Sequence, residues 1–301
     1  MARKRISGLH SGGAHWEHTP DRRSDILLVV SAVNARPQSP DLAHFVTCLH
    51  YQEGEIPAAF ERMLPTGRTH LVVNLYEDEF RTYSGPDCGA VHRTHGAALF
   101  GPRSQSAVID TKEQRCLVRV DFKLGGAAAF FPLPLSETCN QLVELDQLWG
   151  RDGAVLRERL LEARTPKAKL QVLETALLEH LARSRPPDPA IPVAACALER
   201  GISVSEVNSR LGLLPKTLVR RFHHHVGLAP KRFSRVRRLQ RVLRSMIVDK
   251  PVDWAALAAE HGYTDQAHLI HDFRALTGIA PSAYRPSLGE RNHVRLAASA
   301  S

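Results

Sequence analysis

The hydrophobic and polar positions alternate in the first half of the chain, which is the pattern of half-buried strands. Between Cys116 and Phe122, every second side chain is apolar on one side of an extended backbone, and Arg119 and Asp121 fall on the other. Shorter segments of the same kind, over residues 71–76, 80–83, 99–100 and 107–110, are separated by turn-forming residues. The pattern predicts a β-sandwich or barrel, with helices appended over residues 155–163 and 167–182.

The last third of the chain follows a helical period and contains an internal repeat. Eight positions of the first copy recur fifty or fifty-one residues later: Val204, Val207, Gly212, Leu218, Phe222, Gly227, Pro230 and Phe233 return as Trp254, Leu257, Gly262, Leu269, Phe273, Gly278, Pro281 and Tyr284. In each copy an apolar pair three apart forms one helix face, a glycine permits a tight turn, and an apolar pair four apart forms a second helix. The repeat therefore predicts an all-α domain of two helix-turn-helix units.

A long amphipathic helix is predicted between the two units, over residues 233–247. Its apolar side chains occupy one half of the helical wheel, and an arginine stripe occupies the other. The stripe consists of Arg237, Arg238, Arg241 and Arg244. The second helix of a helix-turn-helix unit can lie in the major groove of DNA, so these arginines are the candidates for contacts with backbone phosphates.

The charge is divided unevenly along the chain, and so are its domains. Residues 196–301 hold 17 Lys and Arg against 8 Asp and Glu, whereas the preceding residues hold 23 of each, so the last third carries the whole net charge of +9. A neutral domain joined to a basic one is expected when one domain meets a polyanion. We predict a loose tail over residues 1–24, a β-rich sensing or dimerisation domain over 25–183, a Pro-rich linker over 184–192, a DNA-binding domain over 193–286 and a C-terminal tail over 287–301.

Other classes of protein fit the sequence poorly. No apolar stretch approaches the roughly 18 residues of a membrane span, and the first residues lack the apolar core of a secretory signal, so we expect a cytoplasmic protein. The five cysteines are scattered, odd in number and never spaced as C-x-x-C, which predicts reduced, mostly buried thiols. His70, His92 and His95 lack a metal-binding constellation, and the consecutive residues 223–225 point in different directions on a helix. We therefore expect no metal and no other cofactor.

Residues 262–285, with the sequence GYTDQAHLIHDFRALTGIAPSAYR, resemble the signature of AraC/XylS-family transcription regulators, and residues 211–233 are similar to the first motif of that family. The resemblance implies a monomer that reads two adjacent major-groove segments. Residues 40–182 resemble a cupin-like domain of uncharacterised function that precedes such modules. The segments that carry this second resemblance are 64–75, 101–104, 125–131 and 145–150.

The resemblance also implies which side chains face DNA. In the first recognition helix they are Lys216, Thr217, Val219, Arg220 and Arg221, and in the second they are Gln266, Ala267, His268, Ile270 and His271. Arg220 is the leading candidate for reading guanine, Gln266 for adenine and Ile270 for a thymine methyl group. Ala267 stands where the family usually has Ser, and Leu214 replaces the usual capping Ser, so the sequence preference of relatives does not transfer. Asp253 and Asp265 are predicted to cap helices.

Three functions are weighed on these observations. The first is a sequence-specific regulator of promoter DNA, with RNA polymerase, a small-molecule effector and a second copy of the chain as candidate partners. The second is a DNA-targeted enzyme or repair protein with chemistry in the first domain, for example at a methyl-accepting cysteine, which would need an exposed thiol in electropositive surroundings. The third is an architectural binder indifferent to sequence. Two ordered recognition helices favour the first.

Overall fold

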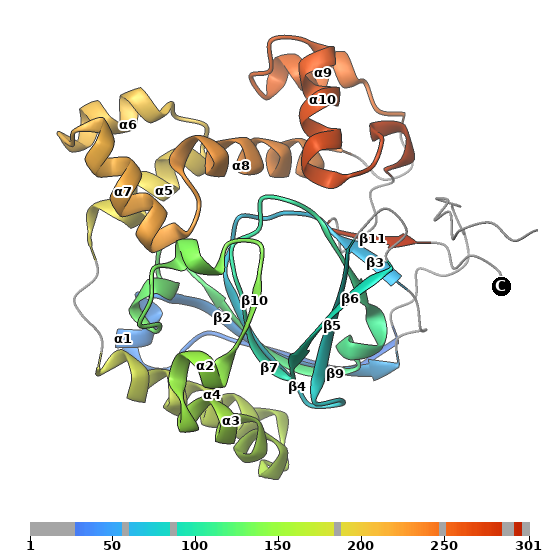
Figure 1. Ribbon diagram of the computed structural model, residues 1–301, viewed down its shortest axis with the longest axis vertical. Coiled ribbons are helices and arrows are strands. Elements are labelled where there is room, and N and C mark those ends of the chain that lie inside the picture. Colours follow the sequence, from blue (N-terminus) through green and yellow to red (C-terminus); the bar gives the residue numbers. More distant parts are fainter. Residues whose placement is uncertain are drawn as a thin grey trace, which may run out of the picture.

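The computed structural model describes residues 28–55, 60–84, 89–183, 188–246, 251–284 and 292–296. It consists of an antiparallel β domain, three helices beneath it and a helical domain above it (Figure 1). This two-domain arrangement of β-sheet followed by helices confirms the predicted α+β fold class. The tail predicted over residues 1–24 lies outside the described residues.

Two antiparallel sheets form the β domain. Their strand orders are β1-β2-β9-β4-β7-β10 and β11-β3-β8-β5-β6. The strands are β1 Leu28–Ala35, β2 Val46–Glu55, β3 Phe60–Met63, β4 His70–Asn74, β5 Glu79–Ser84, β6 Ala90–His95, β7 Ala97–Phe100, β8 Ala107–Asp110, β9 Cys116–Phe122, β10 Leu142–Glu144 and β11 His293–Leu296. The strands predicted over residues 107–110 and 116–122 coincide with β8 and β9, because each has turn-forming or polar residues at both ends.

The helices follow the predicted periodicity. Those of the first domain are α1 Pro40–Ala43, α2 Leu145–Trp149, α3 Arg151–Glu162 and α4 Pro166–Leu181, with short 3₁₀ turns η1 Thr111–Gln114, η2 Ala127–Ala129 and η3 Leu135–Thr138. Those of the second are α5 Ala190–Glu199, α6 Val204–Leu211, α7 Pro215–Val226, α8 Pro230–Ser245, α9 Trp254–Glu260, α10 Gln266–Thr277 and η4 Pro281–Ala283. Ile247, the last residue of the predicted connecting helix, lies outside the described residues.

The alternation along β9 places its two faces in different cores. Val118 and Val120 are at most 1% exposed and pack with Leu156 of α3 and Leu173 of α4. Leu117 points the other way and packs in a smaller cluster with Phe80 of the second sheet. The first sheet is therefore covered by helices on one face and by the second sheet on the other, so β9 is covered on both sides, whereas the alternation predicted a half-buried strand.

The repeat positions form the cores of the two helical units. Leu218 and Phe222 of α7 pack in one cluster, and Leu269 and Phe273 of α10 pack in another. Each of these four side chains is fully buried. Helix α8 contributes to both clusters through different residues, which ties the two units together.

Two predicted segment boundaries need correction. The Pro-rich linker was expected to run to residue 192, but α5 begins at Ala190, because proline is tolerated in the first turn of a helix, where Pro192 lies. A C-terminal tail was expected over residues 287–301, but within it residues 293–296 form β11, which pairs with β3 at the edge of the second sheet. The β domain thus includes residues from both ends of the described chain. The unpaired backbone N–H and C=O groups of a sheet edge can pair with a strand from any part of the chain.

The two domains meet at the turn that connects β3 and β4. Arg237 of α8 is 2% exposed, donates to the carbonyl of Thr66 at 2.8 Å and forms an ion pair with Glu199 of α5. Gln240 donates to the carbonyl of Pro65 at 2.9 Å. Gly67 adopts a φ of +67°, and a side chain there would contact α8, so a glycine suits this close approach. The β3–β4 turn therefore holds α8 through polar contacts.

A buried carboxyl group in the β domain leads to a prediction about pH. Glu113 of η1 is 3% exposed, and burial raises its pKa to about 8. The folded protein therefore binds a proton between pH 4.5 and 8 that the unfolded chain releases, so stability falls as pH rises through this window. We expect Glu113→Gln to remove a slope of up to about 1.4 kcal/mol per pH unit in urea-derived unfolding free energies. The Glu77→Gln variant is the control: bonding to Lys112 lowers the pKa of Glu77, so its stabilising effect is lost only at acid pH. An unchanged slope in Glu113→Gln would contradict the assignment.

None of the helices in the described part of the chain is both long and apolar enough to cross a membrane.

Candidate nucleic-acid interface

Both helical units have the geometry of a helix-turn-helix. The turns contain Gly212 and Gly262, whose φ angles of +62° and +71° are left-handed. The left-handed turn lets the second helix of each unit, α7 or α10, cross the first at a steep angle. The predicted two-helix units are therefore present, each with its own buried core.

The starts of the helices match the expected capping. Asp265 accepts a bond from the backbone N–H of His268 at 2.7 Å and so caps α10, while Asp253 caps α9 through two bonds of 3.0 Å. Leu214 precedes α7 without a capping bond and is 75% exposed, and Pro215 occupies the first turn. The two predicted caps are confirmed, and α7 starts on proline alone.

The predicted reading residues lie on the outward faces of α7 and α10. In the first set Lys216, Val219 and Arg220 are exposed, and Thr217 is half-buried. In the second set Gln266, Ala267 and His271 are exposed, and His268 and Ile270 are half-buried. Val219 is 43% exposed, so its methyl groups lie on the outward face of α7.

The first recognition helix also contacts the β domain. A side chain at Gly227, which ends α7, would lie 2.7 Å from the carbonyl oxygen of Leu135 in η3. Arg221 forms an ion pair of 3.2 Å with Asp188 rather than pointing freely outward. The beginning of α7 is therefore open, whereas its end is packed against the β domain.

Comparison with known proteins identifies both parts of the chain. Residues 208–287 match the model of a helix-turn-helix domain, and residues 35–144 match the model of a domain of unknown function. The C-terminal part of the chain therefore contains an AraC-type helix-turn-helix domain, which supports a DNA-binding transcription regulator. No curated protein matches the chain.

Solved structures that match the chain come from Vibrio cholerae. An apo variant of ToxT has 11% identity over 79% of this chain and 93% of that one, with a TM-score of 0.36. ToxT bound to an unsaturated fatty acid has 11% identity over 76% and 94%, with the same TM-score. ToxT bound to (E)-4-(8-methylnaphthalen-1-yl)but-3-enoic acid has 12% identity over 76% and 97%, with a TM-score of 0.37.

The four arginines predicted to contact phosphates have different surroundings on α8. Arg237 is buried between the domains, and Arg241 donates to the carbonyl of Glu199 at 2.7 Å. Arg238 lies over the ring of Tyr263 at 4.8 Å from its centroid. Arg244 is exposed, whereas Arg238 and Arg241 are half-buried. The prediction is wrong for Arg237, because a side chain that is 2% exposed cannot reach a phosphate.

Exposed cations elsewhere in this regulator were missed by the sequence reasoning. Lys231 and Arg232 on α8 and Arg274 on α10 are exposed. Arg235 is half-buried and forms an ion pair with Asp272 of α10 at 2.8 Å. The sequence does contain a signal for them. Arg232 and Arg235 lie three residues apart and therefore on one face of α8, apart from the stripe that the sequence analysis identified.

The inner face of the first sheet carries a polar cluster. The carboxylate of Asp121 lies 2.6 Å from Nε2 of His50 and 2.7 Å from Nδ1 of His70, and His50 also contacts Asn34. Burial raises the pKa of Asp121, but the bonds from the two histidines outweigh it and hold the pKa well below its usual range. His92 and His95 lie on β6 of the other sheet. In the described residues, no three His, Cys, Asp or Glu side chains are grouped as metal ligands.

The thiols of the regulator are poorly suited to nucleophilic chemistry. The described thiols Cys48, Cys116, Cys139 and Cys196 are free and only partly buried, so the expectation of mostly buried thiols is corrected, and Cys88 lies outside the described residues. Burial raises the pKa of Cys48, Cys116 and Cys139. A methyl-accepting cysteine needs a lowered pKa, so these three groups disfavour the repair hypothesis.

Proposed function

We propose that the regulator recognises a specific DNA site by inserting α7 and α10 into adjacent segments of the major groove. The observation that carries the proposal is the same in both units. The apolar pair four residues apart is fully buried, and the side chains between its members, such as Val219 and His271, face outward. A helix anchored in this way offers its polar face to base edges without disturbing its own core.

The length of α8 supports simultaneous reading by both helices. Its 16 residues span about 24 Å at about 1.5 Å per residue. It packs in the core of each unit through different residues, so one rigid helix fixes α7 and α10 relative to each other. A fixed spacing is what two helices need to enter adjacent major-groove segments, which lie about 34 Å apart on one side of a duplex.

Arg220 provides the test of base reading. Arg220 is exposed near the open start of α7, and its planar guanidinium matches the O6 and N7 atoms of guanine. We expect Arg220→Ala to lower affinity for the preferred site about 10- to 100-fold and to relax preference at one base pair, which corresponds to about 1 to 3 kcal/mol. Selection of sites from a random DNA pool by wild type and variant measures both effects.

Arg210→Ala is the matched control for this experiment. Arg210 is exposed in the same unit but pairs with Glu206 one turn earlier on α6, so its loss should leave base preference unchanged. Equal binding of wild type to selected and random duplexes would refute sequence-specific recognition. A steep fall in log affinity with log salt is expected for both duplexes, because phosphate contacts release counterions in each case.

We further propose that the β domain controls the two recognition helices, through an effector or through pairing of two copies. The support is that α7 and α8 both contact the β domain directly. A shallow groove lies between the domains and includes Arg68, Lys123 and His225 in its lining. Its free space is about that of one water molecule, so an effector there would have to widen the groove and shift α7.

A further inference from the structure

A buried carboxylate joins the second recognition helix to α8. Asp272 of α10 is 4% exposed, and its Oδ1 lies 2.8 Å from both Nε and Nη2 of Arg235. Its Oδ2 lies 4.0 Å from Nε2 of His268. One anion in the interior of the unit thus faces a cation of the connecting helix and an imidazole of the recognition helix.

This arrangement leaves part of the Arg235 guanidinium directed to solvent. The side chain is 41% exposed, whereas that of Asp272 is 6% exposed. Nη1 of Arg235 has no hydrogen-bond partner among the described residues. The guanidinium is therefore held along one edge, by Nε and Nη2, and is available along another.

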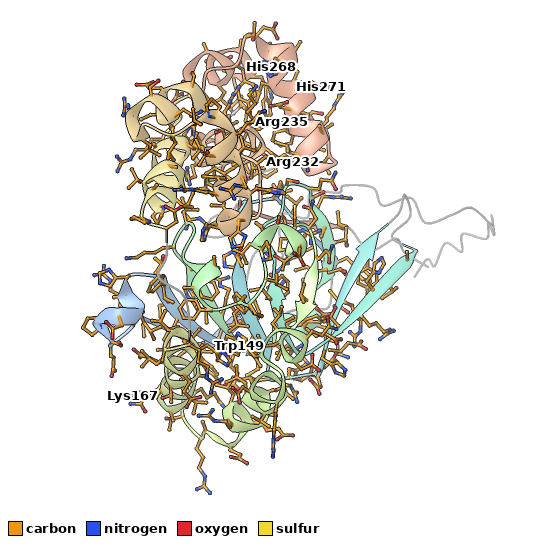
Figure 2. All side chains as sticks on the ribbon, turned by 60° about the vertical axis from the view of Figure 1, so that its left-hand side comes forward. Trp149, Lys167, Arg232, Arg235, His268 and His271 are labelled. Carbon is orange, nitrogen blue, oxygen red and sulfur yellow. The ribbon has the colours of Figure 1, made fainter. Side chains whose placement is uncertain are left out.

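The available edge belongs to a larger basic surface. Arg232 lies three residues before Arg235 on α8, and His271 lies three residues after His268 on α10, so each pair shares a helix face. Figure 2 shows Arg232, Arg235, His271 and His268 following one another along the same side of the helical domain. We call these four residues the α8–α10 surface. It passes directly beside the outward face of α10.

We propose that Arg235 binds a phosphate of the DNA backbone beside the second recognition helix, and that Asp272 is the positioning residue that aims its guanidinium. The proposal rests on the proposed function, since it needs α10 in the groove. A guanidinium already held along one edge loses less side-chain freedom on binding, and its remaining N–H groups suit a phosphate oxygen. Arg235 then fills the role that the buried Arg237 does not.

The test separates positioning from simple charge because the two predict opposite signs. Asp272→Asn removes a negative charge near DNA, so Coulomb attraction alone predicts tighter binding to any duplex. Positioning predicts weaker binding, by about tenfold, and a slope of log affinity against log salt that is smaller by about 0.9, the contribution of one phosphate. Arg235→Gln should produce the same two changes, equally for selected and random sequences.

The experiment uses the full chain and fluorescence anisotropy over a series of KCl concentrations. The probes are a duplex that wild type selects from a random pool and a random duplex of the same length. Glu260→Gln is the control for charge, because Glu260 is an exposed acid of the same unit with 63% side-chain exposure. It should tighten binding slightly and leave the slope unchanged. The double variant Asp272→Asn, Arg235→Gln should bind no more weakly than Arg235→Gln alone.

Two results would overturn the proposal. One is an unchanged or steeper salt slope in Arg235→Gln, and the other is a double variant whose loss is the product of the single losses. Thermal unfolding checks that each variant is folded, and if Asp272→Asn is not, the salt slopes of Arg235→Gln and Arg235→Lys decide, since Lys keeps the charge. If wild type itself fails to distinguish the two duplexes, the proposed function fails instead, and the phosphate contact is still tested on the random duplex.

Discussion

Phe273→Ala is expected to lower the free energy of unfolding by about 4 kcal/mol, the usual cost of truncating a fully buried aromatic side chain. Phe273 is 0% exposed and makes edge-on contacts with the rings of Trp254 and Tyr284, at centroid distances of 5.6 and 5.7 Å. Its removal opens a cavity where α9, α10 and η4 meet. Urea unfolding followed by fluorescence and by circular dichroism measures the loss.

His271→Ala is the control for this prediction because His271 is exposed on the same helix. It should change stability by less than about 0.5 kcal/mol, as surface substitutions usually do. Phe222→Ala should cost as much as Phe273→Ala, because Phe222 is the equivalent buried residue of the first unit. A cost below 1 kcal/mol for both aromatic variants would contradict the duplicated core.

Arg237→Ala is expected to lower the free energy of unfolding by about 3 kcal/mol, because removal of one member of a buried pair leaves the other without compensation. Burial lowers the pKa of Arg237 to about 10, against the opposing effect of Glu199, so the group remains charged at neutral pH. Burial raises the pKa of Glu199, but Arg237 and Arg68 outweigh it and keep the carboxyl ionised. The variant leaves this carboxylate and the Thr66 carbonyl with fewer donors.

Hydrogen exchange measured by mass spectrometry distinguishes this role from a phosphate contact. In Arg237→Ala the backbone amides of the turn around Thr66 and of α8 should exchange faster, because the contacts between the two domains are weakened. Lys231→Ala removes an exposed cation from the same helix and should leave exchange at the turn unchanged. If Arg237→Ala showed the same hydrogen exchange at the turn as wild type but bound DNA more weakly, Arg237 would be a phosphate contact after all.

The helical domain was largely predictable because its signals are local. The spacing of Phe222 and Phe273 within each helix, the glycines of the turns and the caps at Asp253 and Asp265 all act within a few residues along the chain. The strand over residues 116–122 was predictable for the same reason, since alternation is a local pattern. These elements form where the pattern places them.

The partners of individual side chains on α8 were not predictable. Arg237 lies only about 40° from the buried Phe233 on a helical wheel drawn at 100° per residue, so it belongs at the edge of the buried face. Whether an edge position meets solvent or another domain depends on what packs there. The β3–β4 turn, more than 160 residues earlier in the chain, packs there and supplies the Thr66 carbonyl.

The strand β11 also depends on residues that are far away in the sequence. His293 pairs with Met63 and places its ring 2.8 Å from the carboxylate of Glu61, a contact between residues 232 positions apart. A segment of four residues carries too little alternation to be identified as a strand from the sequence alone. They form one because the edge of β3 offers unpaired backbone groups at that point in space.

The sequence by itself determined that the chain ends in two helix-turn-helix units with buried repeat positions and outward reading faces, because these follow from periods of a few residues. The tertiary structure decided which cations meet solvent: Arg237 is sealed between the domains, and Arg235 is held by Asp272 at the surface. The reason is that burial and ion pairing depend on distances in space, and residues far apart in sequence determine those distances.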